Sequence, residues 1–143
     1  MTVKEIEGKD YIRLHQLYTQ LIENESEIGP MLKVLKEIQG DDHYALLGVY
    51  EGETLMGTVT LTRCLDLTGD ARYYYSMENF VIDEAARGKG FGKALLQAAE
   101  KYIIDHNGSY VNFTSSSDRH EAHAFYEKMG YKKDYVEGFK KRF

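Results

Sequence analysis

The chain has 143 residues, of which 43% are hydrophobic and 29% are charged, as is typical of one soluble globular domain with a buried core. The net charge of −5 disfavours nucleic acid as a partner, and the single cysteine, Cys64, excludes an intrachain disulfide and a CxxC metal site. The first ten residues lack an apolar signal core and no later run reaches membrane-spanning length, so we expect a cytoplasmic protein without a membrane partner.

The first half of the chain predicts a strand, two helices and a hairpin. Residues 2–7 favour the strand, residues 10–22 and 30–39 the helices, and residues 44–63 the two strands of the hairpin. The second helix is expected to begin at Pro30, because proline is preferred in the first turn of a helix. The apolar stripe of the first helix, which we expect to pack in the core, consists of Leu14, Leu17, Tyr18, Leu21 and Ile22.

The second half predicts an alternation of strands and helices. Residues 72–82 favour a long aromatic strand, and an alanine- and leucine-rich helix is expected over residues 90–106. A strand over residues 109–114 and a helix over residues 118–129 follow. One or two closing strands are expected within residues 131–143.

Together these elements predict an α/β or α+β fold with one mixed sheet. No repeat, low-complexity segment or linker interrupts them, so we expect a single domain over residues 1–143. The last two strand–helix–strand steps are expected to be right-handed crossovers.

Residues 87–93, Arg-Gly-Lys-Gly-Phe-Gly-Lys, stand between a predicted strand and a predicted helix. They do not form a P-loop, because no Gly-Lys-Ser/Thr follows at the required distance. They do not form a dinucleotide-binding fingerprint either. That motif is Gly-x-Gly-x-x-Gly, whereas the glycines at 88, 90 and 92 form Gly-x-Gly-x-Gly. The segment therefore needs a different explanation.

Glycines before a helix allow the backbone to come close to a bound group, and the first N–H groups of a helix lack acceptors within it. These N–H groups lie at the positive end of the helix dipole, so a diphosphate is a natural ligand. The alternative is a tight turn that only tolerates glycine. Positive charge in the same stretch comes from Arg87, Lys89 and Lys93.

Three stretches resemble the GCN5-related N-acetyltransferase (GNAT) family, in its small-molecule branch. They are RGKGFG at 87–92, ENFVID at 78–83 and AHAFYEKMGY at 122–131. The resemblance implies a single-domain α/β fold whose central sheet is mixed, mostly antiparallel and splayed, with helices on both faces. It also implies acetyl-CoA as co-substrate, a primary amine of a small molecule as acceptor, and no metal. Because family members are often dimers, it allows a homodimer.

The resemblance also implies which residues bind the coenzyme. Arg119 stands where many members have an asparagine that contacts the coenzyme arm, so it is a candidate partner for a coenzyme phosphate. It could equally face a substrate anion or solvent. The backbone of Phe80, Val81 and Ile82 would hold the pantetheine arm. The diphosphate cradle would consist of Arg87, Gly88, Lys89, Gly90, Phe91, Gly92 and Lys93.

Two side chains are candidates for proton transfer. About one alkyl amine in a thousand is neutral at pH 7, so a base assists the attack, and Glu78 is the candidate. An ordered water is the alternative base, and a solvent-facing strand residue is the plain alternative for Glu78. Tyr126 matches the tyrosine that family members often use as general acid, with a core aromatic as its alternative role.

Other functions remain open at this point. A protein-lysine or N-terminal acetyltransferase would share the coenzyme site, and a non-catalytic acyl-CoA sensor would keep it without turnover. A nucleotide-binding module of another class would prefer ATP or NAD.

Overall fold

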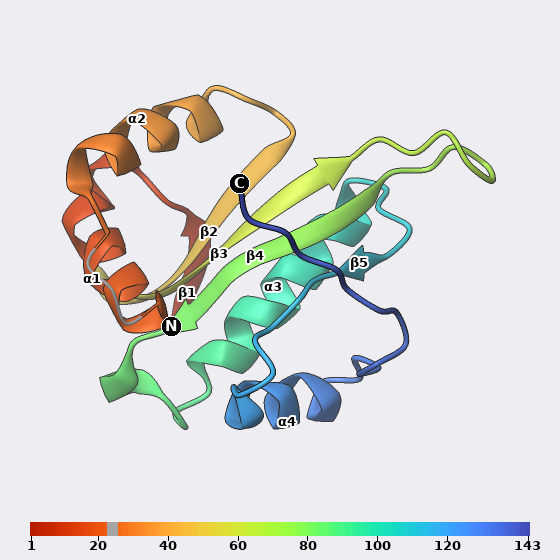
Figure 1. Ribbon diagram of the computed structural model, residues 1–143. Helices are drawn as coiled ribbons and strands as arrows, with labels where there is room; N and C mark the ends of the chain where they lie inside the picture. Colours follow the sequence, from red (N-terminus) through yellow and green to blue (C-terminus); the bar gives the residue numbers. More distant parts are fainter. Residues whose placement is uncertain (23–25) are drawn as a thin grey trace. The chain divides into compact units, whose positions relative to one another are not determined.

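The computed structural model describes residues 1–22 and 26–143 (Figure 1). Contacts along the chain divide it into two compact units, Met1–Asn112 and Phe113–Phe143, and each unit is described by itself. The expectation of one domain over residues 1–143 concerns both units together and stays a prediction.

The first unit contains a five-stranded sheet in the order β1-β2-β3-β4-β5. The first four strands pair antiparallel with their neighbours, and β5 pairs parallel with β4. The predicted mixed, mostly antiparallel sheet is therefore confirmed. The strands are β1 (Thr2–Glu5), β2 (Tyr44–Glu51), β3 (Thr54–Cys64), β4 (Tyr74–Ile82) and β5 (Val111–Asn112).

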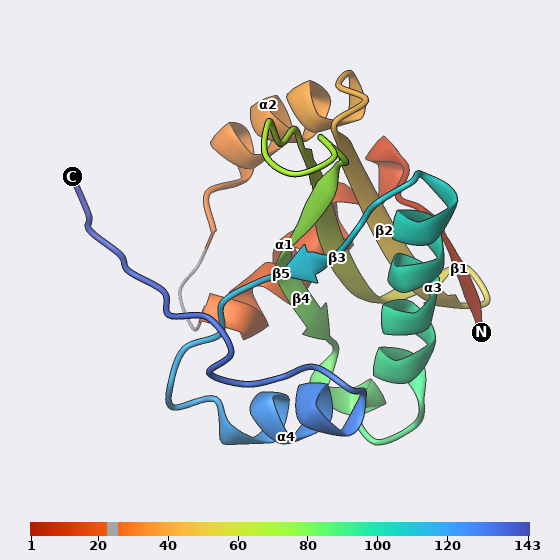
Figure 2. The ribbon, with the colours of Figure 1, turned by 90° about the vertical axis from the view of Figure 1, so that its right-hand side faces the viewer.

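Helices cover both faces of this sheet, with α1 and α2 on one face and α3 on the other (Figure 2). The α-helices of the unit are α1 (Tyr11–Ile22), α2 (Ile28–Gln39) and α3 (Phe91–Asp105), and the 3-10 turns are η1 (Gly8–Asp10) and η2 (Glu84–Ala86). The predicted start of the second helix at Pro30 is wrong by two residues. Proline fits within the first turn because no helical acceptor is available there for the N–H group that it lacks.

Four residues of the predicted apolar stripe of α1 pack in or against the core, but Ile22 at the end of the helix is 50% exposed, so its predicted core position is wrong. Leu14 and Leu17 join a buried cluster with Leu35 of α2 and with residues from the facing side of the sheet. The other members of this cluster are Ile6, which directly follows β1, and the sheet residues Leu46, Tyr50, Leu55 and Val81. Because side chains alternate along a strand, the opposite face is left for α3, whose buried residues are Phe91, Leu95, Leu96, Ala99 and Ile103.

Strand β4 is irregular where it approaches the glycine segment. Its pairing with β3 shifts between Thr58–Val81 and Thr60–Glu78, so β4 carries one extra residue there. Asn79 lies in this bulge with a φ of +52°, a conformation that asparagine tolerates better than most residues. The bulge changes which side chains of β4 face each side of the sheet just before the candidate site.

Residues Phe113–Phe143 contain helix α4 (His120–Lys128). The closing strands predicted within residues 131–143 are wrong, because no described residue of that segment is in a strand. Asp134 has a φ of +57°, which interrupts an extended run, and charged residues recur too often to give a buried face. The predicted strand over residues 109–114 is reduced to β5. Because no strand follows α4 among the described residues, the second predicted crossover is also wrong.

The end of β4 depends on a close approach at Gly57 of β3. A Cβ atom at this position would lie 2.8 Å from the Val81 carbonyl oxygen and 2.4 Å from Ile82 Cδ1. We expect Gly57→Ala to destabilise the protein by about 1–3 kcal/mol, because overpacking forces strands apart. Thermal or denaturant unfolding measures this, with Gly8→Ala as the matched control, since a Cβ there meets nothing within 4 Å. Equal stability of the two variants would contradict the tight packing.

Candidate active site

The glycine segment forms a turn that leads directly into α3. Gly88 has a φ of +74° and Gly90 a φ of +91°, so both positions favour glycine for conformational reasons. A Cβ atom on Gly88 would meet nothing within 4 Å, and one on Gly90 would meet only the Met1 side chain, at 4.0 Å. The glycines therefore keep the backbone of an open turn accessible.

The start of α3 presents backbone donors to this turn. The first helical hydrogen bond runs from the Ala94 N–H to the Gly90 carbonyl, at 3.0 Å. The N–H groups of Phe91, Gly92 and Lys93 thus have no acceptor within the helix and lie at the positive end of its dipole. This arrangement fits a diphosphate, in which two linked anionic groups accept several donors at once.

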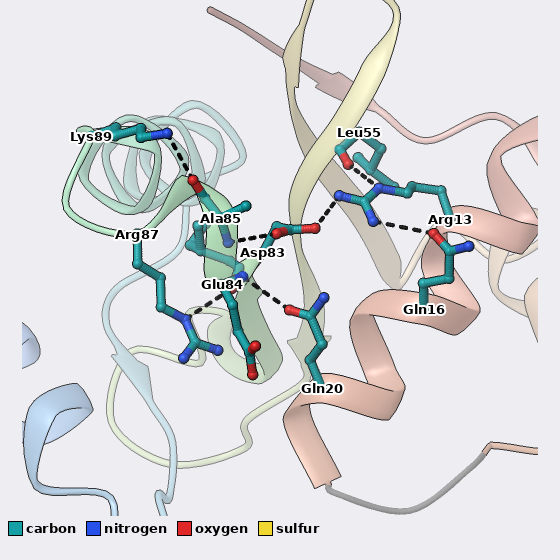
Figure 3. A network of polar contacts seen from close by, with 10 residues as sticks. Arg13, Gln16, Gln20, Leu55, Asp83, Glu84, Ala85, Arg87 and Lys89 are labelled. Atoms are coloured by element: carbon teal, nitrogen blue, oxygen red, sulfur yellow. Dashed lines mark hydrogen bonds and ion pairs between the residues drawn. The ribbon is translucent and has the colours of Figure 1, made fainter.

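Two of the predicted cations fold onto the backbone just before the turn. Arg87 Nε donates to the Ile82 carbonyl at 3.2 Å, and Lys89 Nζ donates to the Ala85 carbonyl at 2.8 Å (Figure 3). Both side chains are exposed, as is that of Lys93. Positive charge therefore surrounds the turn within reach of an anion.

The three residues predicted to hold the coenzyme arm lie at the end of β4. Val81 is buried, whereas Phe80 and Ile82 are half-buried. The pairing of β4 with β5 comprises only Tyr75–Val111 and Ser76–Asn112. Beyond Ser76, no described residue continues the strand pairing of β4 with β5.

Glu78 is exposed on β4, where the hydroxyl of Ser76 donates to its Oε1 at 2.9 Å. It stands opposite Thr60 in the register of β3 and β4. Burial raises the pKa of the Tyr18 phenol on α1, and hydrogen bonds with Thr60 and Thr58 act against that rise. A row of hydroxyl groups therefore lies on this sheet face beside Glu78.

The sequence pattern placed Tyr18 only in the apolar stripe of its helix. Its hydroxyl gives that stripe a polar end facing β3, which helical periodicity alone does not distinguish from a core contact.

Tyr126 and Arg119 belong to the unit of residues 113–143 and are described only within it. The Tyr126 ring packs at 4.6 Å from Phe113 and at 6.2 Å from Tyr131, measured between ring centroids. Burial raises the pKa of Tyr126 to about 12, although the nearby Arg119 charge lowers it. The phenol is therefore neutral, and a proton donor, over the whole physiological range.

A hollow of about 290 Å³ lies at the opposite end of α3 from the glycine turn. Tyr102 and His106 at the C-terminal end of the helix line it, together with Glu5, Asp42 and Arg63. Since α3 has 15 residues, its two ends are about 22 Å apart. The hollow is therefore separate from the glycine turn.

Among the described residues, no three His, Cys, Asp or Glu side chains come together in a way that could hold a metal ion. In the same part of the chain, no helix is long and apolar enough to cross a membrane.

Sequence reasoning missed the residues that hold the base of the turn, namely Arg13, Gln20 and Asp83 (Figure 3). The only signal was the spacing of Arg13, Gln16 and Gln20 by three and four residues, which places them on one polar stripe of α1. Such a stripe usually faces solvent, so the pattern alone does not indicate a contact.

Comparison with known proteins agrees with this geometry. The family model described as "Acetyltransferase (GNAT) family" matches residues 10–131. The Bacillus subtilis uncharacterized N-acetyltransferase YhdJ is 27% identical over 133 residues, covering 92% of this chain and 88% of that protein. The B. subtilis protein YxbD is 30% identical over 90 residues, covering 61% of this chain and 57% of YxbD.

A solved structure extends the likeness to the whole chain. It is a putative acetyltransferase from Agrobacterium tumefaciens, with a TM-score of 0.91, 26% identity and full coverage of both chains. A mixed, mostly antiparallel five-stranded sheet with helices on both faces is the fold of the acetyltransferase class. The chain belongs to the acetyltransferase (GNAT) family.

Proposed function

We propose that the protein transfers the acetyl group of acetyl-CoA to a primary amine of a small molecule. The observation that carries this proposal is the open turn at Gly88 and Gly90, which leads into three N–H groups without helical acceptors. The turn binds the coenzyme diphosphate, and the backbone of Phe80, Val81 and Ile82 binds the pantetheine arm. Arg119 contributes to the coenzyme site through a phosphate.

Glu78 acts as the base in this proposal. It accepts a proton from the acceptor ammonium, directly or through one water, so that the amine lone pair can attack the carbonyl carbon of the thioester. Ser76 holds the carboxylate through its hydroxyl, at 2.9 Å. A backbone N–H near Val81 stabilises the negative charge that develops on the carbonyl oxygen.

Tyr126 assists the leaving group. As the bond between carbonyl carbon and sulfur breaks, the electron pair goes to sulfur, and the phenol of Tyr126 donates a hydrogen bond to it. The pKa of Tyr126 is about 12, whereas that of a thiol is about 8.5, so complete proton transfer is uphill. A strong hydrogen bond to the developing thiolate is therefore the main contribution. As the amide forms, the attacking nitrogen loses its second proton to solvent, and solvent supplies the proton of the free thiol.

The chemistry beside Glu78 supports a small polar amine as acceptor. A carboxylate attracts the cationic form of the amine, and the hydroxyl groups of Ser76, Thr60 and Tyr18 offer hydrogen bonds to a hydroxylated ligand. The stretch from Glu78 to Asp83 also resembles family members that act on sugar phosphates.

The test is a panel of amines incubated with acetyl-CoA while free thiol is measured. We expect turnover with small primary amines and with few peptides. Turnover with lysine peptides alone would indicate a protein acetyltransferase instead of a small-molecule enzyme. Coenzyme binding without any turnover would indicate a sensor. Failure of coenzyme A to bind, with ATP or NAD binding instead, would overturn the whole assignment.

Replacement of Glu78 by glutamine tests the base. We expect kcat/KM for the amine to fall about 10- to 100-fold at pH 7, and the loss to shrink above pH 9, where more of the amine is already neutral. The affinity for coenzyme A should stay unchanged. Glu53→Gln is the matched control, because it removes another exposed carboxylate, in the turn between β2 and β3. An equal effect of both variants would leave Glu78 without a specific role.

A further inference from the structure

A polar stripe of α1 reaches across to the base of the glycine turn (Figure 3). Arg13 donates through Nε to the Leu55 carbonyl at 2.8 Å, and another nitrogen of its guanidinium pairs with Asp83. The Arg13 side chain is 26% exposed and that of Asp83 is 10% exposed. Gln16 accepts from Arg13 at 3.1 Å, which fixes the orientation of the guanidinium. The pair is therefore partly withdrawn from water and geometrically constrained.

Asp83 connects three parts of the first unit. Its N–H donates to the Met56 carbonyl at 2.8 Å and thereby extends the pairing of β4 with β3. Its carboxylate accepts the Ala85 N–H at 2.7 Å, which caps the 3-10 turn before the glycine segment. The same carboxylate binds Arg13 of α1, so a change at any of these contacts affects the other two.

A second contact from α1 reinforces the first. Gln20 lies two turns further along the helix, and its Oε1 accepts the Glu84 N–H at 3.0 Å. Two consecutive residues at the base of the turn are thus held by the same helix. The contacts of Arg87 and Lys89 with carbonyls lie in the same short stretch, between residues 82 and 89.

Asp83 is charged, so the contact between α1 and the base of the turn depends on its counter-ion Arg13. Burial alone would raise the pKa of the carboxyl, but the hydrogen bonds from Arg13 and the Ala85 N–H lower it overall. Asp83 is therefore ionised at neutral pH. Removing Arg13 would leave a mostly buried carboxylate without its counter-ion, which favours rearrangement of the turn.

The same helix also reaches the sheet face that carries Glu78. Tyr18 lies between Arg13 and Gln20 in sequence, and its hydroxyl interacts with Thr58 and Thr60 of β3. Thr60 stands opposite Glu78. Thus α1 contacts both the base of the glycine turn and the neighbours of the candidate base.

We propose that Arg13 is a positioning residue that acts through Asp83. It holds the glycine turn in the conformation that binds the coenzyme, and it couples coenzyme binding at the turn to the order of α1. The inference rests on the proposed function, because it takes coenzyme A as the ligand of the turn. When the coenzyme fixes the turn, it also fixes Asp83, and Asp83 restricts the motion of α1 through Arg13. Coenzyme binding at the turn therefore orders α1 beside Glu78. Coupling of this kind is reciprocal, and an acceptor bound under α1 would strengthen coenzyme binding equally.

Coenzyme affinity is the first test. We expect Arg13→Gln and Asp83→Asn each to raise the dissociation constant of coenzyme A about tenfold in calorimetry. The double variant should be no weaker than the weaker single variant, because both changes remove the same contact. Lys101→Gln is the matched control for charge, since Lys101 forms an exposed ion pair with Asp105 on α3, and it should bind like the wild type. Additive losses in the double variant would overturn the proposal.

Hydrogen exchange separates positioning from general stabilisation. In the wild type, coenzyme A should slow amide exchange in peptides from residues 83–94 and also in peptides from α1. In Arg13→Gln at saturating coenzyme A, the slowing at 83–94 should remain and the slowing in α1 should be lost. An undiminished response of α1 in the variant would overturn the proposal.

Two outcomes keep the inference and the proposed function apart. If the wild type does not bind coenzyme A, the proposed function fails and the inference fails with it. If the wild type binds and the variants bind equally well, only the inference fails. Should Arg13→Gln not fold, Arg13→Lys keeps the charge but cannot bridge Leu55 and Asp83 together, so a loss of about threefold is expected there. Wild-type affinity and exchange in that variant would equally overturn the proposal.

Discussion

Gly90→Glu is expected to raise the dissociation constant of coenzyme A by about 100-fold or more, a loss of about 2.7 kcal/mol of binding free energy. The new carboxylate would lie at the start of α3, where the proposed cradle holds two linked phosphates. It would repel them and occupy the space that lets the backbone approach. Titration calorimetry with coenzyme A measures the loss.

The backbone at this position requires a matched control. Gly90 has a φ of +91°, so any side chain introduces strain of about 1–3 kcal/mol, whatever its charge. Gly90→Ala shares this strain but lacks the carboxylate. A carboxylate near a helix N-terminus is also favourable in the unliganded protein, so Gly90→Glu should melt no lower than Gly90→Ala. Equal coenzyme affinity of the two variants would contradict the diphosphate cradle.

Tyr126→Phe is expected to lower kcat about 100-fold while the affinity for coenzyme A changes less than twofold. The change removes one hydroxyl and keeps the ring packed against Phe113 and Tyr131. If the phenol acts only on the departing thiolate, kcat and kcat/KM fall together, because the interaction exists only in the transition state. Steady-state kinetics with the best amine from the panel measures both values.

The pH profile provides an independent check on Tyr126. Its pKa is raised to about 12, so the group keeps its proton as the pH rises, and the donor stays intact up to pH 10. Wild-type activity should therefore not decline between pH 8 and 10 through ionisation of this residue. Tyr131→Phe, which removes a hydroxyl from the same aromatic cluster, is the control. An unchanged kcat in Tyr126→Phe would show that the phenol does not stabilise the departing thiolate.

The two variants separate enzyme from sensor. A sensor would respond to Gly90→Glu through the loss of coenzyme binding but would show no turnover for Tyr126→Phe to reduce. An enzyme responds to both, with the first variant acting on binding and the second on the chemical step.

The sequence by itself determined the features that depend on local spacing. The apolar stripe of α1 follows the 3.6-residue period, and the hairpin of residues 44–63 follows from two β-rich runs joined by Glu51-Gly52-Glu53. The glycines at 88, 90 and 92 indicated a turn before a helix where the backbone can come close to a bound group, and Gly88 and Gly90 have positive φ angles in such a turn. These features could be predicted because backbone hydrogen bonding and burial act over a few neighbouring residues.

The sequence pattern did not determine the local conformation of the tail after Tyr131 or of the bulge in β4. The tail after Tyr131 has aromatic residues that favour strands, but its charges leave no face to bury, and Asp134 turns the chain. The bulge at Asn79 has no counterpart in any spacing rule, since its extra residue is defined only by the partner strand.

The tertiary structure alone decided how the glycine turn is held. Arg13 and Asp83 are 70 residues apart in sequence, and Gln20 and Glu84 are 64 apart, so neither contact leaves a local pattern. Their meeting depends on the order of the strands and on the side of the sheet that α1 covers. Local spacing fixed the turn that faces the ligand, whereas long-range packing fixed its attachment to α1, because only a folded sheet brings these side chains within hydrogen-bonding distance.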